Sequence, residues 1–313
     1  MLADIFQALA DPTRVRILGL LGRMELSVGE LAQVLGQSQP RVSRHVKILA
    51  DAGLAERRRE GSWVFLALVT GPRAEALARL CDMLAGDADR AQAEADARLL
   101  AAVRTERARA AEGWFGAHAA VWDGIRSLHV AESEVEAAVA RAVGSEVGRL
   151  VDVGTGTGRM LELFAPAASA AVGIDKSSEM LRVARAKLDE LDARVELRQA
   201  DMYALPLPSG GADCVILHQV LHYAAEPAAA IREAARVLAP GGRLVVIDFA
   251  PHDFEELRAR DQHQRLGFAD GAVLEWMRGA GLDGEVLEHL EGGALTVTSW
   301  RGVKPAVPLR RVA

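Results

Sequence analysis

The chain has 313 residues, half of them hydrophobic, which is long enough for two domains with separate cores, while no apolar run approaches the roughly 20 residues of a membrane-spanning helix. The first ten residues carry acidic charge and the two cysteines, Cys81 and Cys214, lack metal-ligand spacing, so we expect a cytoplasmic chain without a signal peptide, a disulfide framework or a zinc site. The net charge of -6 argues against a protein that binds nucleic acid over its whole surface, so any such contact must be local.

The N-terminal segment carries the start and stop signals of short helices. The pair Asp11-Pro12 can end one helix and begin the next. Ser27 and Glu30 have the spacing of a capping box at the start of a helix predicted over residues 28–35, and Gly36 is placed to end it.

A second helix follows after a tight turn, with Ser38 as its expected cap and Pro40 in its first turn. Its inner face carries apolar residues at helical spacing: Val42, Val46 and Leu49. Its outer face carries side chains that can contact base edges and phosphates in a major groove: Gln39, Arg41, Ser43, Arg44, His45 and Lys47. Together with Ser38, this face is the predicted DNA-binding surface.

Residues 54–68 contain two extended segments around the turn Glu60-Gly61-Ser62, a pattern typical of a β-hairpin. Arg57 and Arg58 on this hairpin are expected to contact the DNA backbone, where their contribution depends on salt rather than on base sequence.

Residues 8–21 and 25–61 together resemble the arsenical-repressor (ArsR/SmtB) family over about 70 residues. The resemblance implies an α+β winged helix-turn-helix domain over residues 1–85 that binds operator DNA, with an inverted repeat bound by a homodimer. Metal sensors of that family carry thiols before the second helix, but residues 25–30 contain no cysteine, and residues 72–84 contain no histidine. We therefore expect no metal site.

Residues 86–112 are rich in Ala, Arg and Glu, have few apolar anchors and predict a helical linker. Two interpretations remain open. The helix contributes to a dimer interface together with the one that starts at Pro72, or it is a solvated spacer.

Strand and helix patterns alternate in residues 113–313 and predict a doubly wound, Rossmann-like α/β domain. The predicted strands are Arg149 to Val153, Ala170 to Ile174, Val195 to Gln199, Cys214 to His218 and Arg243 to Phe249. The predicted helices are Arg159 to Phe164, Ser178 to Leu191 and Pro227 to Leu238.

Polar groups follow successive strands of this domain, at the edge where open sheets bind ligands. The glycine-rich loop with Gly154, Gly156 and Gly158 follows the first strand. Asp175 ends the second strand, where its carboxylate can accept both hydroxyls of a ribose, and Asp201-Met202 follow the third, where a carboxylate and an N–H can pair with an adenine edge. A glycine-rich loop alone also occurs in dinucleotide folds, which favour the spacing G-x-G-x-x-G.

The observed spacing G-x-G-x-G, with residues 200–227 and 236–249, resembles class I S-adenosylmethionine-dependent methyltransferases over about 150 residues. That resemblance implies a mostly parallel seven-stranded sheet and S-adenosylmethionine or S-adenosylhomocysteine as the ligand. It places the methionine end of the ligand at Asp152 and the glycine loop, and the ribose at Asp175. It further places the adenine at Asp201 and Met202, and the amino group at the carbonyl of His218.

The acceptor of a methyl group is harder to predict. The chain has no Asn/Asp-Pro-Pro-Tyr element, no Pro-Cys nucleophile and no cysteine set for arsenic, which disfavours nucleobase and arsenic acceptors. Polar side chains after the fourth strand lie near the expected methyl group: His218, Gln219, His222 and Tyr223. A candidate lid consists of Trp114, Phe115, His118 and Trp122.

Two functions remain from the sequence. In the first, which we favour, the second domain is a sensor whose bound nucleoside shifts the equilibrium between DNA-binding and non-binding dimers, as in regulators of methionine-cycle genes that respond to S-adenosylhomocysteine. In the second, the domain is an active small-molecule methyltransferase tethered to its own regulator.

Overall fold

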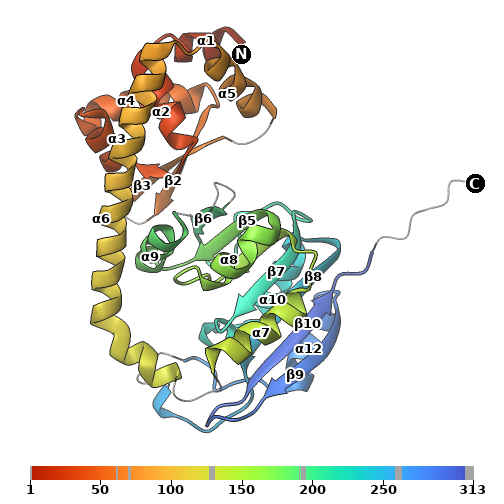
Figure 1. Cartoon of the computed structure of the whole chain (residues 1–313). Helices are drawn as coiled ribbons and strands as arrows, with labels where there is room; N and C mark the ends of the chain where they lie inside the picture. Colours follow the sequence, from red (N-terminus) through yellow and green to blue (C-terminus); the bar gives the residue numbers. More distant parts are fainter. Residues whose placement is uncertain are drawn as a thin grey trace, which may run out of the picture. The chain divides into compact units, whose positions relative to one another are not determined.

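The computed structural model describes residues 2–60, 63–69, 72–126, 131–189, 191, 195–257 and 263–306. The chain divides into two compact units, Met1–Ala110 and Ala111–Ala313 (Figure 1). In the described parts of the chain, no helix is long and apolar enough to cross a membrane.

The first unit is a helical domain with a small antiparallel sheet. Its elements are α1 (Leu2–Leu9), α2 (Pro12–Leu21), β1 (Leu26–Ser27), α3 (Val28–Leu35), α4 (Gln39–Asp51), β2 (Ala55–Glu60), β3 (Trp63–Leu68) and α5 (Pro72–Leu84). The strands lie in the order β1-β3-β2. The predicted hairpin is formed by β2 and β3, and its turn residues Gly61 and Ser62 lie outside the described residues. The strand β1 was not predicted, because two residues are too few for an alternating pattern.

The short helices begin and end where the sequence predicts. The side chain of Asp11 accepts a hydrogen bond of 2.8 Å from the backbone N–H of Thr13 at the start of α2. Ser27 and Glu30 form the capping box of α3, and Gly36 ends that helix in the left-handed region with φ 62°. These caps satisfy backbone groups that a helix end leaves without partners, which fixes the turn between α3 and α4.

The helix α6 (Asp87–Arg126) has 40 residues and crosses the boundary between the two units. Its first part packs on the winged domain, because Leu100 and Val103 are each only 2% exposed and belong to the core of that domain. Arg16 of α2 also holds Asp96 of α6 through two hydrogen bonds of 3.0 and 2.6 Å. The beginning of the stretch expected to be a linker is therefore part of the winged domain's core.

The second unit contains a seven-stranded sheet in the order β6-β5-β4-β7-β8-β10-β9. After α7 (Glu132–Val143), its elements are β4 (Gly148–Val153), α8 (Arg159–Phe164), the 3-10 turn η1 (Ala165–Ala167), β5 (Ala168–Asp175), α9 (Ser178–Leu188), β6 (Val195–Gln199), β7 (Ala212–His218), the 3-10 turn η2 (Leu221–Tyr223), α10 (Pro227–Val237), β8 (Leu238–Phe249), α12 (Asp270–Gly279), β9 (Asp283–Leu290) and β10 (Val297–Val303). Strands β4 to β8 pair in parallel, and β10 runs antiparallel to both β8 and β9. The predicted mostly parallel sheet is confirmed.

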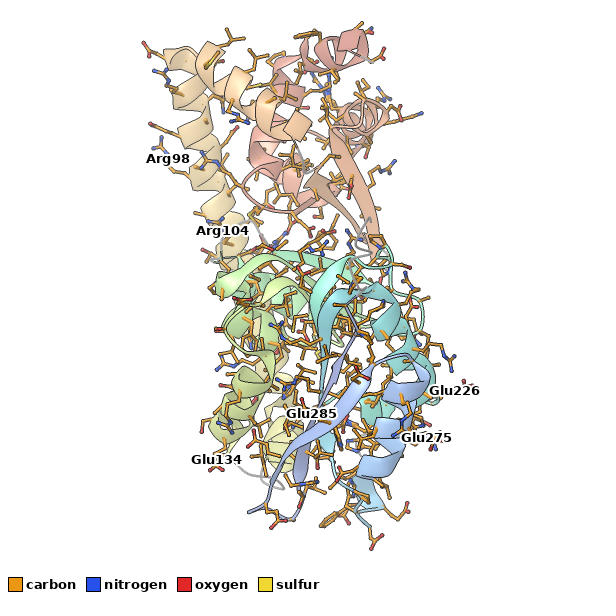
Figure 2. The ribbon with its side chains drawn as sticks, turned by 90° about the vertical axis from the view of Figure 1, so that its right-hand side faces the viewer. Arg98, Arg104, Glu134, Glu226, Glu275 and Glu285 are labelled. Atoms are coloured by element: carbon orange, nitrogen blue, oxygen red, sulfur yellow. The ribbon has the colours of Figure 1, made fainter. Side chains whose placement is uncertain are left out.

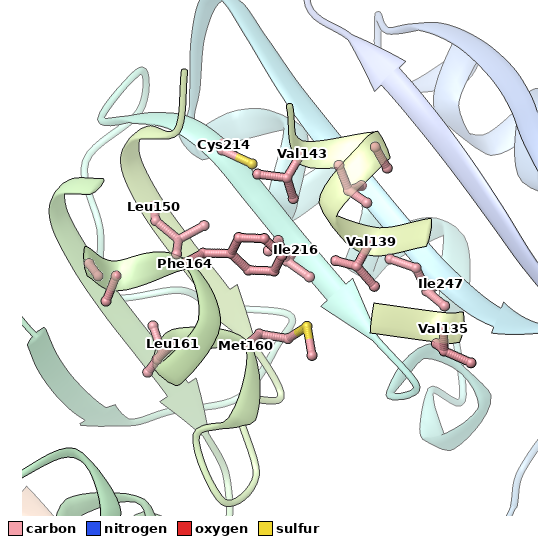
Figure 3. Packing of buried hydrophobic residues seen from close by; sticks show 14 of the residues in the cluster. Val135, Val139, Val143, Leu150, Met160, Leu161, Phe164, Cys214, Ile216 and Ile247 are labelled. Carbon is pink, nitrogen blue, oxygen red and sulfur yellow. The ribbon is translucent and has the colours of Figure 1, made fainter. Parts of the chain in front are cut away.

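Apolar side chains pack against both faces of this sheet. On one face, residues of α7 and α8 meet those of β4 and β7 (Figure 3). The labelled side chains in that picture include Val139 of α7, Phe164 of α8 and Ile216 of β7. The opposite face is covered by α10 and α12, with Trp300 of β10 fully buried beneath them. A sheet covered on both faces leaves the ends of its strands as the place for a ligand.

Charged side chains lie on the outside of the second unit. Figure 2 labels Glu134, Glu226, Glu275 and Glu285, all of which are exposed.

Candidate functional site

The exposed face of α4 gathers the side chains predicted to contact DNA. Val42, Val46 and Leu49 are buried in the domain core, which leaves the other side of the helix to solvent. The residues exposed there are Ser38, Gln39, Arg41, Ser43, Arg44 and Lys47. Ser38 occupies the N-cap position with extended backbone but makes no side-chain cap hydrogen bond, which differs from the prediction.

His45 has a different environment from the other residues predicted to contact DNA. Its side chain is 13% exposed, and its Nδ1 lies 3.9 Å from Oδ1 of Asp11 at the start of α2. The ring therefore lies between the helices rather than on the open face. On the hairpin, Arg57 is exposed, while the side chain of Arg58 lies outside the described residues.

The described residues contain no group of three or more His, Cys, Asp or Glu side chains arranged to hold a metal ion. In the segment where metal sensors carry thiols, Ser27 and Glu30 are engaged in the capping box.

The glycine loop follows β4 and has a left-handed backbone at Gly154 (φ 72°), Gly156 (φ 54°) and Gly158 (φ 84°). A Cβ atom at Gly154 would lie 2.2 Å from a methyl group of Val220, and one at Gly158 would lie 2.9 Å from Leu188. These two glycines are required by packing. A Cβ at Gly156 would meet nothing closer than a backbone oxygen at 4.0 Å, so this part of the loop borders open space.

Asp152 lies beneath the loop and is 1% exposed. Its Oδ2 accepts a hydrogen bond of 2.6 Å from the hydroxyl of Thr155. Burial raises the pKa of Asp152 to about 7, the Thr155 hydroxyl opposes this rise, and the negative charge of Asp175 adds to it. The carboxylate therefore favours a nearby positive charge, such as an ammonium or sulfonium group.

Asp175 ends β5 and faces the loop. Its Oδ2 accepts the N–H of Gly156 at 2.9 Å, and its Oδ1 accepts the N–H of Ser177 at 2.8 Å. Burial raises the pKa of Asp175 above its ordinary value, and the hydrogen bonds from Ser177 and Gly156 oppose this rise. The carboxylate is thus held in one orientation at the carboxyl end of the strand.

Asp201 and Met202 follow β6 and are half-buried. Oδ1 of Asp201 accepts the N–H of Tyr203 at 3.2 Å, and Nζ of Lys176 lies 3.4 Å from its Oδ2. His218 is the last residue of β7, and the next residue, Gln219, has φ 49°. Among the described residues, Gln219 is alone in combining a positive φ with a side chain. Such backbone strain is found where a surrounding structure holds a functional loop in place.

The structure also shows a pair of side chains, His222 and Asp248, that the sequence did not predict to be in contact. His222, in η2, is 3% exposed, and its Nδ1 lies 2.8 Å from Oδ1 of Asp248 on β8. An acid at the carboxyl end of an apolar strand was visible in the sequence, but its pairing with His222 depends on the parallel arrangement of β7 and β8. The candidate lid residues Trp114, Phe115, His118 and Trp122 lie on α6, and their side chains are outside the described residues.

An adenosyl thioether fits the polar groups at these strand ends. The open side of Gly156 allows a ligand to approach the backbone, which a larger residue would prevent. A buried carboxylate at Asp152 suits the cationic methionine end, and the fixed carboxylate of Asp175 suits vicinal hydroxyls. The residues present therefore match the chemistry of that ligand.

Comparison with known proteins gives two independent matches. A family model described as "Bacterial regulatory protein, arsR family" matches residues 11–57, and one described as "Methyltransferase domain" matches residues 151–246. The arsenical resistance operon repressor of Escherichia coli is 44% identical over 66 residues, which are 21% of this chain and 56% of that protein.

The second unit is similar to methyltransferases. A demethylmenaquinone methyltransferase of Clavibacter sepedonicus is 30% identical over 196 residues, covering 54% of this chain and 79% of that protein. With several other curated relatives, the match spans 35% to 58% of their length. The crystal structure of YcgJ from Bacillus subtilis shares the fold with a TM-score of 0.50 and 18% identity, over 56% of this chain and 100% of that one.

Proposed function

Since this chain belongs to the class I methyltransferase family and carries an arsR-family helix-turn-helix domain, we propose that it is a DNA-binding transcription regulator whose second domain binds S-adenosylmethionine or S-adenosylhomocysteine as its effector. The observation that carries this proposal is the helix α6. One continuous helix belongs to the core of the winged domain and extends into the unit with the glycine loop. A continuous helix is a physical route by which a ligand can bias DNA binding.

The proposed DNA contacts divide into two kinds. Arg41 and Arg44 on the exposed face of α4 contact base edges, while Arg57 on β2 contacts phosphates. Ser38, Gln39, Ser43 and Lys47 flank these contacts. His45 and Arg58 were also predicted to contact DNA, and we assign His45 a supporting role because its ring packs beside Asp11.

The proposed ligand contacts follow the strand ends. The methionine end lies at Asp152 and the glycine loop, and the ribose lies at Asp175. The adenine lies at Asp201 and Met202, and the carbonyl of His218 accepts the amino group. When bound, the ligand supplies a sulfonium methyl group or, in its demethylated form, a neutral thioether.

We further propose that the protein is a homodimer bound to an inverted repeat. Large apolar side chains remain exposed on the helices of the first unit, including Phe6 at 54%, Met83 at 78% and Leu84 at 74%. Exposed apolar side chains that gather on one domain favour burial against a partner.

An active methyltransferase is the second candidate function, and the pair His222–Asp248 favours it. A buried histidine oriented by a carboxylate at the ligand edge of the sheet can accept a proton during methyl transfer. One relative is named demethylmenaquinone methyltransferase, which is the name of an enzyme that transfers a methyl group.

Calorimetric titration of both nucleosides, with and without operator DNA, tests the proposal. Linkage requires that the operator change nucleoside affinity by the same factor by which the nucleoside changes operator affinity. Tight nucleoside binding that is identical with and without DNA would contradict an effector role and favour the tethered enzyme.

A further inference from the structure

One residue at the carboxyl end of β7 has a backbone conformation that residues with side chains rarely adopt. Gln219 has φ 49°, while the other described positions with positive φ are all glycines. Crowding between Cβ and the backbone makes this left-handed region unfavourable for a residue with a side chain. Contacts with the surrounding structure must therefore hold Gln219 in place.

These contacts lie on both sides of Gln219. Its N–H donates to the carbonyl of Ile247 on β8 at 2.7 Å. The next side chain, Val220, is 9% exposed and packs on the glycine loop so closely that a Cβ at Gly154 would lie 2.2 Å from its methyl group. The carbonyl of Val220 accepts the N–H of Tyr223 in η2 at 3.1 Å. Because it is held from both ends, Gln219 keeps a conformation that is unfavourable by itself.

The same contacts set the direction of the carbonyl of His218. The peptide between His218 and Gln219 is planar and trans, so its C=O and N–H point in opposite directions. Because the N–H points to β8, and β7 lies between β4 and β8, the carbonyl points toward β4. The last residue of β4, Val153, is paired with Leu217, and the glycine loop follows it. The carbonyl of His218 is therefore directed to the loop at which the proposed ligand binds.

An ordinary φ at Gln219 would disrupt this arrangement. Moving φ from 49° to the negative values of most residues is a rotation of more than about 100°. With Val220 packed against Gly154, the peptide that precedes Gln219 would have to rotate. Its N–H would then leave Ile247, and its carbonyl would no longer point to the glycine loop.

We propose that Gln219 is a positioning residue, whose left-handed backbone directs the carbonyl of His218 at the amino group of the bound nucleoside. This inference rests on the proposed nucleoside site and names the residue that determines how that site recognises the amino group. An ammonium group donates a charge-assisted hydrogen bond to a carbonyl, and the strength of this bond depends on its direction. Because the carbonyl is already directed in the unliganded chain, ligand binding does not have to reorder it.

Two other roles for Gln219 make different predictions. In the first, its side-chain amide binds the amino group, and every substitution that removes the amide would weaken the contact. In the second, its backbone only shapes a turn, and substitutions would change stability without changing the recognition of one group on the ligand. Two ligands that differ in the amino group alone separate both roles from the proposal.

The experiment uses calorimetry to measure the affinities of the full-length protein for S-adenosylhomocysteine and for its deaminated analogue, in which hydrogen replaces the amino group. The ratio of the two affinities reports the amino-group contact. Gln219→Val places a β-branched side chain at a positive φ, which such residues adopt only as outliers. The ratio should fall at least about fivefold in this variant, because the amino group loses a charge-assisted hydrogen bond.

Two further variants separate the backbone of Gln219 from its side chain. Gln219→Gly adopts a positive φ without strain, and Gln219→Ala keeps the Cβ but loses the amide, so both should keep the ratio within about twofold of wild type. Gln219→Gly should also melt at a higher temperature than Gln219→Ala, because a positive φ favours glycine. At an ordinary φ, glycine would be the less stable of the two.

The matched control is Gly210→Val. Gly210 has φ 72° and nothing within 4 Å of a Cβ, and it lies before the amino end of β7 rather than after its carboxyl end. This variant has the same kind of backbone strain away from the proposed ligand. It should therefore keep the wild-type ratio.

A wild-type ratio in a folded Gln219→Val variant would overturn the proposal. An equal loss of the ratio in Gln219→Ala and Gln219→Gly would also overturn it, because recognition would then belong to the side-chain amide. If Gln219→Val does not fold, the other two variants decide, and a lower melting temperature for Gln219→Gly than for Gln219→Ala would contradict the left-handed backbone.

The two ligands also separate a failure of this inference from a failure of the proposed function. Equal affinity of the wild-type protein for both ligands would overturn the amino-group contact and leave the nucleoside site intact. Binding of neither ligand would contradict the proposed nucleoside site itself.

Discussion

Arg107 of α6 and Glu30 of α3 form a bidentate ion pair, in which Nε of Arg107 lies 2.8 Å from Oε1 of Glu30 and Nη2 of Arg107 lies 2.9 Å from Oε2 of Glu30. The same carboxylate accepts the N–H of Ser27 at 2.7 Å in the capping box of α3. Arg107 also donates to the carbonyl of Glu25 at 2.9 Å. The helix α6, which continues into the second unit, is therefore bonded to the N-terminal turn of α3, the first helix of the helix-turn-helix.

We expect Arg107→Met to weaken the coupling between nucleoside and operator. Burial alone would raise the pKa of Glu30, but the Arg107 guanidinium and the Ser27 N–H hold that pKa below its ordinary value. Without Arg107, a mostly buried carboxylate loses its counterion, which should cost about 1 to 3 kcal/mol of stability. Nucleoside affinity should stay within about twofold of wild type, while the ligand-induced change in operator affinity shrinks severalfold.

Arg98→Met on the exposed side of α6 is the matched control for Arg107→Met. Within the part of the chain that the structure describes, its guanidinium donates to the backbone carbonyl of Glu94 at 3.4 Å and contacts no residue of the winged domain, so coupling should be unchanged. Full coupling in Arg107→Met, measured by operator binding with and without S-adenosylhomocysteine, would show that α6 acts through other contacts.

We also expect the winged domain to require the first part of α6 for stability. Leu100 and Val103 are buried in its core, and Asp96 pairs with Arg16. Burying a Leu or Val side chain contributes about 1.5 to 3 kcal/mol. A fragment of residues 1–85 should therefore unfold at a clearly lower temperature than a fragment of residues 1–109. Equal melting temperatures in circular dichroism would indicate that α6 adds no stability.

Much of the fold follows from local signals in the sequence. The capping box at Ser27 and the left-handed Gly36 fix α3, and β6 and α8 have the predicted bounds. The core role of Leu100 was not predicted, because two apolar residues in a long polar helix are too few to indicate which surface they cover. The pairing of His222 with Asp248 depends on contacts 26 residues apart, which no local pattern encodes.

For DNA binding, we expect the two kinds of contact to differ in their salt dependence. Arg41→Ala or Arg44→Ala should weaken specific operator binding by about 1 to 3 kcal/mol if the side chain contacts a base. Arg57→Ala should weaken binding to all sequences and flatten the salt dependence. His45→Ala should have a smaller effect, because its ring is only 13% exposed. Unchanged operator affinity in the double variant Arg41→Ala, Arg44→Ala would exclude α4 as the recognition helix.

For the nucleoside, we expect Gly156→Val to abolish binding. A side chain at Gly156 would enter the open space beside the loop. Gly210→Val is the matched control, because Gly210 also has a positive φ (72°) and no neighbour within 4 Å of a Cβ. Both variants carry similar backbone strain, and only the first should lose the ligand in calorimetry. Retained binding in Gly156→Val would place the ligand elsewhere.

Loss of the proposed ribose contact is tested separately. Asp175→Ala should weaken nucleoside binding at least about tenfold, because charge-assisted hydrogen bonds to ribose hydroxyls contribute about 1.5 to 3 kcal/mol. The Gly156 and Ser177 N–H groups also lose their acceptor in this variant, so its melting temperature must be measured alongside. Affinity within twofold of wild type in a folded variant would contradict the ribose assignment.

The buried carboxyl of Asp152 should make both stability and ligand affinity depend on pH. Its pKa is about 7 in the folded protein against 3.8 as the ordinary value, so the folded state holds the proton more tightly than the unfolded state. The stability that this provides is complete below about pH 4 and is lost as the pH rises through about 7. Asp152→Asn keeps an acceptor for the Thr155 hydroxyl and cannot ionise, so it should stabilise the unliganded domain by about 1 to 3 kcal/mol at pH 8 and by little at pH 4.

The cationic ligand has the opposite preference, because it favours the ionised carboxylate of Asp152. Affinity for S-adenosylmethionine should therefore rise between about pH 6 and about pH 8 in the wild type, and this rise should be smaller in Asp152→Asn. Calorimetry and urea unfolding at matched pH values measure both effects, and a variant that is destabilised at pH 8 yet keeps the full rise in affinity would show that Asp152 is not the group that titrates.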